Sequence, residues 1–365
     1  MGVPWVAQVR LLHLIILGIT TVTFVMYVVY MSTPQPRTTA SPVLTLVSLD
    51  YHAPHTNGSN LEQTLVKNDS VANVRNVSSE VSTNTTQPDL TRGVFAEVIY
   101  EGGHTNTNNN ICPEQGKNLQ LLIIITSAPS HESARMAIRQ TWGHFAARRD
   151  VSIVFMLGST TNADYKDKIE KEQFLYEDIL QGKFVDTYEN LTLKSISMLE
   201  WVKDNCPKTD FVLKTDDDMF INIPRLLTFL SKHNPEVRAI YGRLAKKWKP
   251  IRNKKSKYYI SPQQYKPAVF PDFTTGPAYL LPARLAKELY AASLNHTYFK
   301  LEDVFLTGIV ANDLKIKRIH APEFLNKRVS LAPCSIQKGI SIHMVKGAEQ
   351  FDLWKKLLDG HAKCK

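Results

Sequence analysis

The stretch FVLKTDDDMF, residues 211–220, places three consecutive aspartates directly after an apolar run. The short segment 211–215 begins with the apolar residues FVL, which predicts a buried strand. Like charges repel one another and are costly to bury, so a packed core does not favour Asp216, Asp217 and Asp218. These aspartates are therefore expected at the end of the strand, where a ligand can reach them.

Apolar and amphipathic segments alternate on both sides of this stretch. Strands are predicted at 120–128, 151–159, 183–188 and 211–215, and helices at 131–142, 164–180, 191–205 and 224–233. Strands that alternate with helices predict an α/β fold with a mostly parallel sheet and helices on both faces. Ligands of such sheets bind at the carboxyl ends of the strands, where the aspartates lie.

An acidic cluster in this position is suited to hold a divalent cation. Carboxylate oxygens favour Mn²⁺ or Mg²⁺, and the cation can bridge phosphate oxygens of a substrate. The alternative is a solvated acidic turn or helix N-cap, because MFINIP follows the cluster. An EF-hand is excluded, because its glycine and its spaced ligands are missing.

The apolar segment LLHLIILGITTVTFVMYVVYM, residues 11–31, predicts a transmembrane helix. As a helix it would be about 31 Å long, close to the roughly 30 Å thickness of the hydrocarbon core. A cleaved signal peptide is the alternative, but its apolar region would be shorter. Arg10 precedes the segment and Arg37 is the first charge after it, so residues 1–10 are expected to be a cytoplasmic tail.

Residues 32–115 are rich in Thr, Ser, Asn and Pro and show no regular hydrophobic period, which predicts an extended stem. The stem carries a net charge of −4, so the net charge of +10 arises from residues 116–365, which carry +13. A basic domain of this kind favours anionic ligands such as phosphates and does not by itself indicate nucleic acid.

Six sequons and four cysteines point to the lumen of the secretory pathway. N-glycans are expected at Asn57, Asn68, Asn76, Asn84, Asn190 and Asn295. Four cysteines allow three disulfide pairings, and the sequence does not choose among them. We favour Cys112–Cys206 together with Cys334–Cys364, a loop that would pin the C-terminal tail.

Several motifs accompany FVLKTDDDMFIN in the same order along the chain: RMAIRQTWG, FMLGS, YEDIL, FVDTYENLTLKS, FTTGPAYLLP and LEDVF. Together, from about residue 120 to 345, they strongly resemble the Golgi β-1,3-glycosyltransferases, which include β-1,3-galactosyltransferases and β-1,3-N-acetylglucosaminyltransferases. The resemblance implies a GT-A-like catalytic domain at 116–365, a UDP-sugar donor, Mn²⁺ with Mg²⁺ as the alternative, and a single-pass type II protein of the Golgi membrane.

The resemblance also implies roles for the acidic residues. Asp218 and Asp216 would hold the cation, with Asp216 and Asp217 also close to the nucleotide. His343 in GISIHMVKG occupies the place of a third ligand, for which His320 competes. Asp303 in LEDVF would be the catalytic base that deprotonates the acceptor hydroxyl in an inverting transfer, and Glu302 would orient it or touch the acceptor.

Four basic residues are expected in the donor site. Arg135 and Arg139 lie four residues apart, on one face of a helix, and the resemblance places them in the nucleotide pocket. Lys194 in NLTLKS and Lys214 in LKTDDD are further candidates. Simple surface solvation or an ion pair is the alternative for the two arginines.

The donor sugar is less clearly indicated than the reaction. FPDFTTGPAY (270–279) departs from the usual YPPYxSGxxY, in a region that shapes the sugar site. LEDVFLTGI favours galactose, with N-acetylglucosamine as the alternative and a catalytically silent carbohydrate-binding protein as the further one. The acceptor is expected to be a glycan on a glycoprotein or glycolipid, and a homodimer is left open. The basic run 242–259 is either a solvated loop or a lid that attracts an anion.

Overall fold

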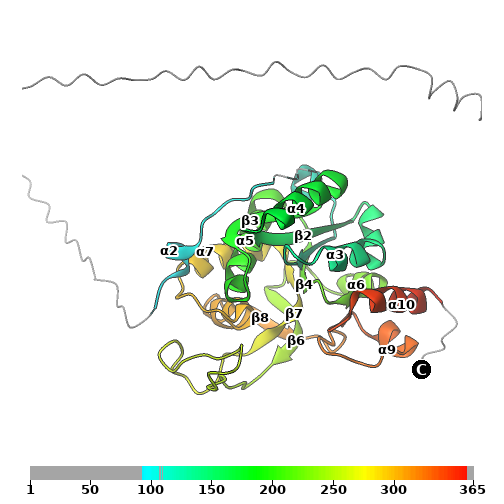
Figure 1. Ribbon diagram of the computed structural model, residues 1–365. Helices are drawn as coiled ribbons and strands as arrows, with labels where there is room; N and C mark the ends of the chain where they lie inside the picture. The colour runs from blue at the N-terminus through cyan, green and yellow to red at the C-terminus, as the bar shows by residue number, and fades with distance from the viewer. Residues whose placement is uncertain (1–92, 107, 109, 360–365) are drawn as a thin grey trace, which may run out of the picture. The chain divides into compact units, whose positions relative to one another are not determined.

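The computed structural model describes residues 93–106, 108 and 110–359, and within them one large sheet forms the centre of the fold (Figure 1). Its strands run in the order β3-β2-β1-β4-β7-β6-β8. Their bounds are β1 Leu121–Thr126, β2 Val151–Ser159, β3 Ile179–Val185, β4 Phe211–Asp216, β6 Ala239–Ala245, β7 Phe273–Pro282 and β8 Lys317–His320. Neighbouring strands are parallel except where β7 meets β4 and β6. The predicted mostly parallel sheet is therefore confirmed.

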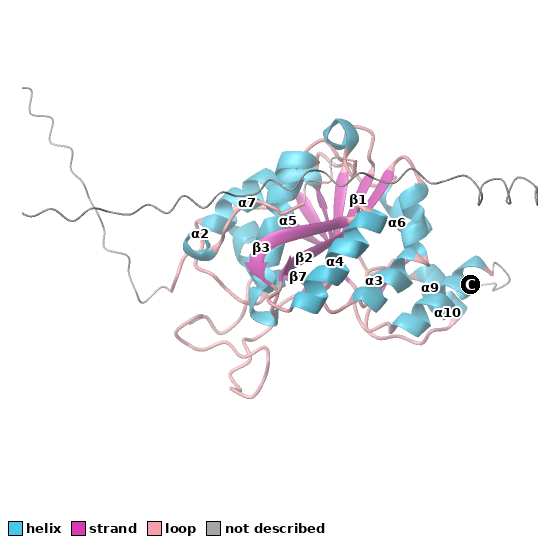
Figure 2. Cartoon of the chain, turned by 45° about the horizontal axis from the view of Figure 1, so that its top comes forward, coloured by secondary structure: helices cyan, strands magenta, loops and turns pink. Residues whose placement is uncertain are grey.

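Helices cover both faces of this sheet, as Figure 2 shows for α5 and α7 on one side and α3 and α4 on the other. Alternate residues of β1 belong to the hydrophobic clusters on opposite faces of the sheet. Leu122 and Ile124 share a cluster with residues of α5 and α7. Leu121 and Ile123 share the other cluster with residues of α3, α4 and α6. This alternation follows from the two-residue period of a strand. The helices are α2 Ala96–Ile99, α3 Glu132–Arg139, α4 Ala163–Tyr176, α5 Leu191–Asn205, α6 Ile223–Leu230, α7 Ala286–Leu294, α8 Ala311–Asp313, α9 Pro333–Lys338 and α10 Gly347–Leu358.

The predicted strand 151–159 and helix 191–205 have the observed bounds, but the region between them needed correction. The predicted helix 164–180 ends at Tyr176, and Glu177 adopts a left-handed conformation with φ 51°. Ile179 and Leu180 then begin β3, so the strand predicted at 183–188 starts four residues earlier. Ile179 and Leu180 would fit an apolar helix face equally well. They form a strand because they pair with Phe155 and Met156 of β2.

Two further helices are shorter than predicted. The helix expected at 131–142 ends at Arg139 and is followed by a 3₁₀ segment, Trp142–Ala147. The helix expected at 224–233 spans Ile223–Leu230, with the Asn222 side chain accepting a hydrogen bond from the Arg225 N–H at its start. Such caps satisfy the free N–H groups of a first turn.

The last residues assigned to the stem pack against the folded domain. Phe95 bridges Thr297, His104 bridges Gly182, and Glu200 accepts hydrogen bonds from the Tyr100 hydroxyl at 2.9 Å and the Gly103 N–H at 2.7 Å. The packed part of the chain therefore extends N-terminally beyond residue 116. The hydrogen bonds of Tyr100 and Gly103 depend on Glu200 of α5, which the composition of the stem does not reveal.

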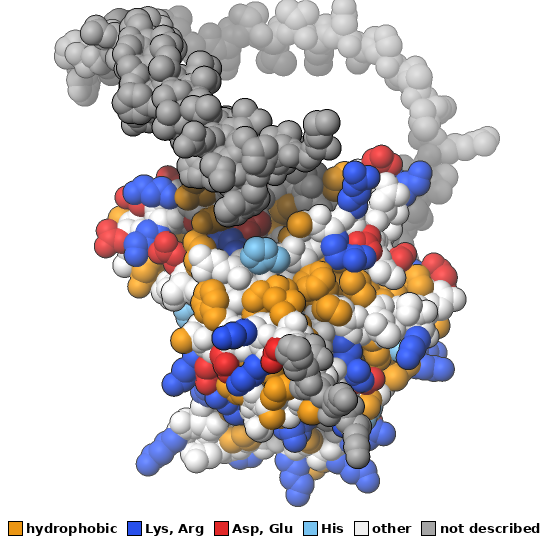
Figure 3. All heavy atoms as spheres, turned by 90° about the vertical axis from the view of Figure 1, so that its right-hand side faces the viewer, with side chains coloured by type: hydrophobic (Ala, Val, Ile, Leu, Met, Phe, Trp, Pro, Cys, Tyr) orange, Lys and Arg blue, Asp and Glu red, His pale blue; other side chains and the backbone are white. Residues whose placement is uncertain are grey.

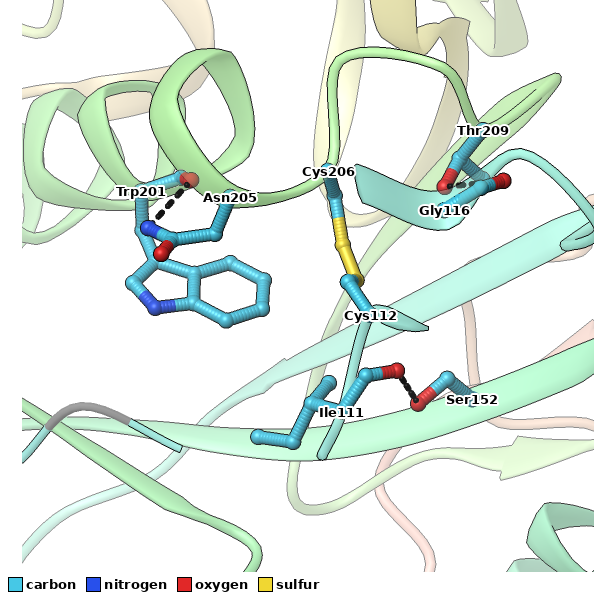
Figure 4. The surroundings of a disulfide bond; sticks show 8 residues. All are labelled: Ile111, Cys112, Gly116, Ser152, Trp201, Asn205, Cys206 and Thr209. Carbon is cyan, nitrogen blue, oxygen red and sulfur yellow. Dashed lines mark hydrogen bonds between the residues drawn. A yellow bond between two sulfur atoms is a disulfide. The ribbon is translucent and has the colours of Figure 1, made fainter. Parts of the chain in front are cut away.

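One of the two predicted disulfides is present: Cys112 is joined to Cys206 at the end of α5 (Figure 4). Cys364, the proposed partner of Cys334, lies outside the described residues, as do the predicted transmembrane segment 11–31 and the sequons up to Asn84. Among the described residues, no helix is both long enough and apolar enough to cross a membrane.

A second, two-stranded sheet pairs β5 (Phe220–Ile221) with β9 (Ser341–Ile342) in antiparallel fashion. It matters for the site because β5 follows the three aspartates directly. The pairing brings the chain after residue 342 back to the carboxyl end of β4.

Candidate active site

Asp216 is the last residue of β4, and two buried neighbours orient its carboxylate. β1 and β4 pair in parallel with Thr126 opposite Asp216. The Thr126 hydroxyl donates to Asp216 Oδ1 at 2.7 Å, and Lys214 Nζ donates to the same oxygen at 2.6 Å. The predicted placement of the acidic cluster at the carboxyl end of the sheet is therefore what the structure shows.

Asp217 is held by residues that follow β1. Its Oδ2 accepts a hydrogen bond from the Ser127 hydroxyl at 2.6 Å and lies 2.8 Å from His131 Nδ1. The hydrogen bond to Asp217 is the main reason why the pKa of His131 is raised above its ordinary value. His131 therefore joins the site, although sequence reasoning did not select it.

Asp218 meets His343, and the small sheet is the cause. Phe220 pairs antiparallel with Ile342, so Asp218, two residues before Phe220, lies close to the residues that follow Ile342. The Val345 N–H donates to the Asp218 carbonyl at 2.9 Å, and His343 Nε2 lies 3.3 Å from Asp218 Oδ2. The competing residue, His320, lies on β8, where its Nδ1 accepts from the Leu244 N–H at 3.3 Å.

Asp216, Asp218 and His343 fit a divalent cation. One ligand atom from each residue can be chosen so that all three lie within 4.8 Å of one another. Asp218 Oδ1 is buried and has no hydrogen-bond partner among the described residues, which is costly unless a ligand satisfies it. Two carboxylates and an imidazole are a donor set that Mn²⁺ or another divalent ion accepts.

Asp303 lies at the same edge of the sheet. Thr215 of β4 pairs with Ala278 of β7, so Gly276 extends past the end of β4. The Gly276 N–H donates to Asp303 Oδ2 at 2.9 Å, and the Val304 N–H donates to Oδ1 at 2.9 Å. Burial, followed by the charge of Glu302, raises the pKa of Asp303 to about 6. A short π-helical segment, Val304–Val310, follows it directly.

Lys214 connects the two acidic groups. Its Nζ donates to Asp216 Oδ1 and, at 2.9 Å, to the carbonyl of Gly276, whose N–H holds Asp303. Glu302 lies 3.8 Å from the same ammonium and accepts a hydrogen bond from the Tyr279 hydroxyl at 2.6 Å. Burial lowers the pKa of Lys214, but Asp216 and Glu302 outweigh it and raise the pKa above its ordinary value. Lys214 is therefore charged, and it belongs to the framework between the acids.

Arg135 lies behind Asp217 and is fully buried. It forms two 2.7 Å hydrogen bonds with the Glu172 carboxylate, from Nε and Nη2. Its Nη1 donates to the Ser127 hydroxyl at 3.1 Å and to the Ala128 carbonyl at 2.6 Å. Arg135 thus supports the segment that orients Asp217.

Lys194 and Arg139 are also paired with acids. Lys194 Nζ, on α5, donates to the Ser127 carbonyl at 2.6 Å and contacts Asp186 at 2.9 Å. Arg139 contacts Asp178 and Glu172 at 2.7 Å each. A direct contact of Arg135, Arg139 or Lys194 with a nucleotide stays a prediction.

Chemically, the edge presents a cation-compatible cluster beside a second carboxylate that can accept a proton. The residues that sequence reasoning missed are mostly polar groups at strand ends: Thr126, Ser127, His131, Asp186 and Tyr279. Thr126 and Ser127 end the first predicted strand, so the rule that ligands meet strand ends could have selected them. His131 carried no such signal.

Comparison with known proteins agrees with this geometry. The sequence model of the family described as "Galactosyltransferase" matches residues 133–322. β-1,3-Galactosyltransferase 5 of Homo sapiens is 35% identical over 242 residues, which cover 65% of this chain and 78% of that protein. UDP-GlcNAc:betaGal β-1,3-N-acetylglucosaminyltransferase 7 of Rattus norvegicus is 33% identical over 254 residues, 65% of this chain and 64% of that protein.

Among solved structures, galactosyltransferase LgtC in complex with donor and acceptor sugar analogues has a TM-score of 0.37 and 9% identity, and the match covers 65% of this chain and 96% of that chain. The family match extends from the start of α3 to just beyond β8 and so contains the aspartates and Asp303. The chain therefore belongs to the galactosyltransferase family of UDP-sugar-dependent β-1,3-glycosyltransferases.

Proposed function

We propose that this protein is an inverting β-1,3-galactosyltransferase with a GT-A-like catalytic domain. It transfers galactose from UDP-galactose to a hydroxyl of a glycan on a glycoprotein or glycolipid, in the Golgi lumen, as a type II membrane protein. The observation that carries the proposal is the pairing of two acidic groups at one sheet edge, the cluster of Asp216, Asp218 and His343 and the carboxylate of Asp303.

Asp216, Asp218 and His343 would hold the divalent cation, for which we propose Mn²⁺. Such an ion, when bound, would supply positive charge against the charge that develops on the UDP leaving group. Thr126 and Lys214 keep Asp216 in place through its Oδ1, and Ser127 keeps Asp217 in place.

Asp303 has the properties of the base in a direct displacement. An inverting transfer needs one carboxylate on the acceptor side, which takes the proton of the attacking hydroxyl. Each oxygen of Asp303 accepts one backbone N–H and keeps a further lone pair for that proton. With a pKa of about 6, the carboxylate is ionised at neutral pH and is more basic than an ordinary aspartate.

Galactose is the proposed donor sugar because of the LEDVFLTGI segment and the similarity to β-1,3-galactosyltransferases. The alternative, N-acetylglucosamine, is supported by a relative of nearly equal identity. The sugar site includes the 270–279 segment, where Phe270 and Phe273 are buried against each other and against Phe299 and Trp248.

The test is a donor screen with the full chain in detergent and Mn²⁺. UDP-galactose, UDP-GlcNAc and UDP-GalNAc are each offered with a panel of neutral and acidic oligosaccharides, and the anomeric configuration of the product is read by NMR. We expect β-linked galactose and a loss of at least about 100-fold in kcat for Asp218→Ala, because the cation loses a ligand.

Asp352→Asn, which changes an exposed acid on α10, is the matched control and is expected to keep full activity. An α-linked product would refute inversion, and transfer of GlcNAc alone would favour the rival donor. Asp218→Ala with wild-type turnover would refute the assigned metal cluster.

A further inference from the structure

The chain between β6 and β7 contains an unusually basic stretch, residues 246–258, here called the basic loop. It holds seven cationic side chains, and no Asp or Glu occurs between residues 237 and 271. Figure 1 shows it as the irregular yellow-green segment that projects beyond β6. The cations of the basic loop are Lys246, Lys247, Lys249, Arg252, Lys254, Lys255 and Lys257.

Contacts within the loop and with its flanks hold its shape. The Ile260 N–H donates to the Ile251 carbonyl at 3.0 Å. Arg252 donates to the carbonyls of Ile260 and Tyr265 at 2.9 and 2.7 Å. The Trp248 ring packs edge-on against Phe273, with ring centres 5.5 Å apart. The backbone of the loop is therefore ordered by groups other than its lysines.

The lysines of the loop have no acidic partner among the residues that the structure describes. Within the part of the chain that the structure describes, no carboxylate lies at ion-pair distance from Lys246, Lys247, Lys249, Lys254 or Lys255. On the face seen in Figure 3, by contrast, Lys and Arg side chains adjoin Asp and Glu in several places. Concentrated, unpaired positive charge attracts anions and destabilises its own surroundings, so an anionic ligand is the natural complement.

One end of the loop reaches the active-site side of the sheet. The rings of Tyr258 and Tyr188 meet edge-to-face at 6.4 Å, and Lys257 Nζ lies 5.1 Å from the Tyr188 ring centre and 5.0 Å from that of Tyr258. Burial is the main cause of the raised pKa of Tyr188, the charge and hydrogen bond of Tyr258 come next, and the charges of Asp303 and Asp216 add smaller contributions.

Two hydrogen bonds join the Tyr188 segment to the residues that precede Asp303. The Tyr298 hydroxyl donates to the carbonyl of Glu189, next to Tyr188, and the Thr192 hydroxyl donates to the carbonyl of Phe299 at 2.7 Å. The chain from Tyr298 leads within a few residues to Asp303. The segment that carries Tyr188 is therefore tied to the segment that leads to Asp303.

The charge of the donor already has its own complement. Asp216, Asp218 and His343 suit the cation that meets the diphosphate, and Lys194 and Lys214 are engaged by acids in the framework. Through Tyr258 and Tyr188, the basic loop is linked to the segment that precedes Asp303, the base beside which the acceptor hydroxyl must lie. Tyrosine rings offer a face on which a sugar ring can pack.

We propose that the basic loop, with Tyr188 and Tyr258, forms an acceptor subsite that selects anionic glycans, which carry a sulfate or a carboxylate close to the hydroxyl that is glycosylated. This proposal rests on the proposed transferase function and specifies its acceptor class. Sulfate esters and sugar carboxylates share an anionic oxygen group, and the experiment separates them.

The test compares matched acceptors with the full chain and the donor that supports turnover, starting with UDP-galactose. The acceptors are a GlcNAc-terminated disaccharide, its 6-O-sulfated form, and a disaccharide of equal length that carries a uronic acid. Each exposed ion pair changes affinity by a factor of about 2–5, so two or three give about a tenfold preference at low salt. We expect wild-type kcat/KM to favour one or both anionic acceptors by this factor, and 0.5 M NaCl to remove the preference.

The variant Lys254→Gln/Lys255→Gln/Lys257→Gln removes three cations of the loop. We expect the KM for the preferred anionic acceptor to rise by about five- to twentyfold, while the KM for the donor and the kcat/KM for the neutral acceptor stay unchanged. The matched control is Lys166→Gln/Lys168→Gln/Lys171→Gln, which removes three cations from the exposed face of α4 and should leave every constant unchanged.

Turnover without any preference for the anionic acceptors would overturn this inference and leave the proposed transferase function intact. A triple variant that loses activity on all acceptors equally, or whose donor KM rises, would overturn it as well. If no donor supports turnover, the proposed function fails, and calorimetric binding of the three disaccharides in the presence of UDP then decides the loop. Equal binding of neutral and anionic forms by wild type and variant would also refute the subsite.

Discussion

Replacement of the proposed base, Asp303→Asn, should strongly reduce activity and at the same time stabilise the fold at neutral pH. The pKa of Asp303 rises from 3.8 to about 6, mainly through burial. Below pH 3.8 both the folded and the unfolded state bind this proton. Between pH 3.8 and about 6 the unfolded state releases it first, so stability falls as the pH rises through this range.

The magnitude follows from the same difference. It corresponds to about 3 kcal/mol of lost stability above pH 6 if the carboxylate were shielded from water. Asp303 is partly exposed, and water at its exposed side reduces this figure. Asparagine also has one acceptor oxygen in place of two, so it loses one of the hydrogen bonds from Gly276 and Val304, at a cost of about 1 kcal/mol. We therefore expect a net gain of about 1–2 kcal/mol at pH 7.5.

Urea unfolding of both proteins at pH 7.5 and pH 4 measures this gain. Asp303→Asn should be the more stable protein at pH 7.5, and the difference should shrink or reverse at pH 4, where the wild-type carboxyl is protonated. Its kcat should fall by about 10²–10⁴-fold, the usual contribution of a general base. The wild-type kcat/KM should decline about tenfold per pH unit below pH 6. A variant that is less stable at pH 7.5, or that keeps wild-type activity, would refute the reasoning.

Two further predictions concern the framework around the site. Lys214→Met should lower the free energy of unfolding by about 3–5 kcal/mol, because it leaves Asp216 and Glu302 without their buried cation. Because Lys214 lowers the pKa of Asp303, this variant should also shift the acidic limb of the pH profile of kcat/KM to higher pH. An acidic limb at the wild-type pH would exclude an effect of Lys214 on the pKa of Asp303. The double variant Cys112→Ser/Cys206→Ser opens a loop with a sequence separation of 94 residues and should lower the free energy of unfolding in urea by about 4–5 kcal/mol. An unchanged midpoint would show that the segment before Cys112 is held by its other contacts alone.

Prediction from the sequence worked best where one local pattern decides the structure. The β2 strand and the α5 helix have their predicted bounds because each is a long, regular pattern with clear breaks on both sides. The boundary between α4 and β3 was wrong because Ile179 and Leu180 suit either element, and the neighbouring strand β2 decides between them. The arginines of α3 show a similar limit, since their spacing indicated a shared face but not the acids that pair with it, Glu172 of α4 and Asp178 just before β3.

The sequence by itself determined the class of fold, the place of Asp216–Asp218 at a strand end, and the family, because these depend on hydrophobic periods and on motifs that are contiguous in the chain. Only the tertiary structure decided which distant residues meet these aspartates. His343 reaches Asp218 through the β5–β9 pairing, and Asp303 is held by Gly276 because β7 runs antiparallel to β4. The contact of Tyr258 with Tyr188 likewise joins segments about 70 residues apart. Such contacts depend on strand register and loop packing, which no local pattern of residues encodes.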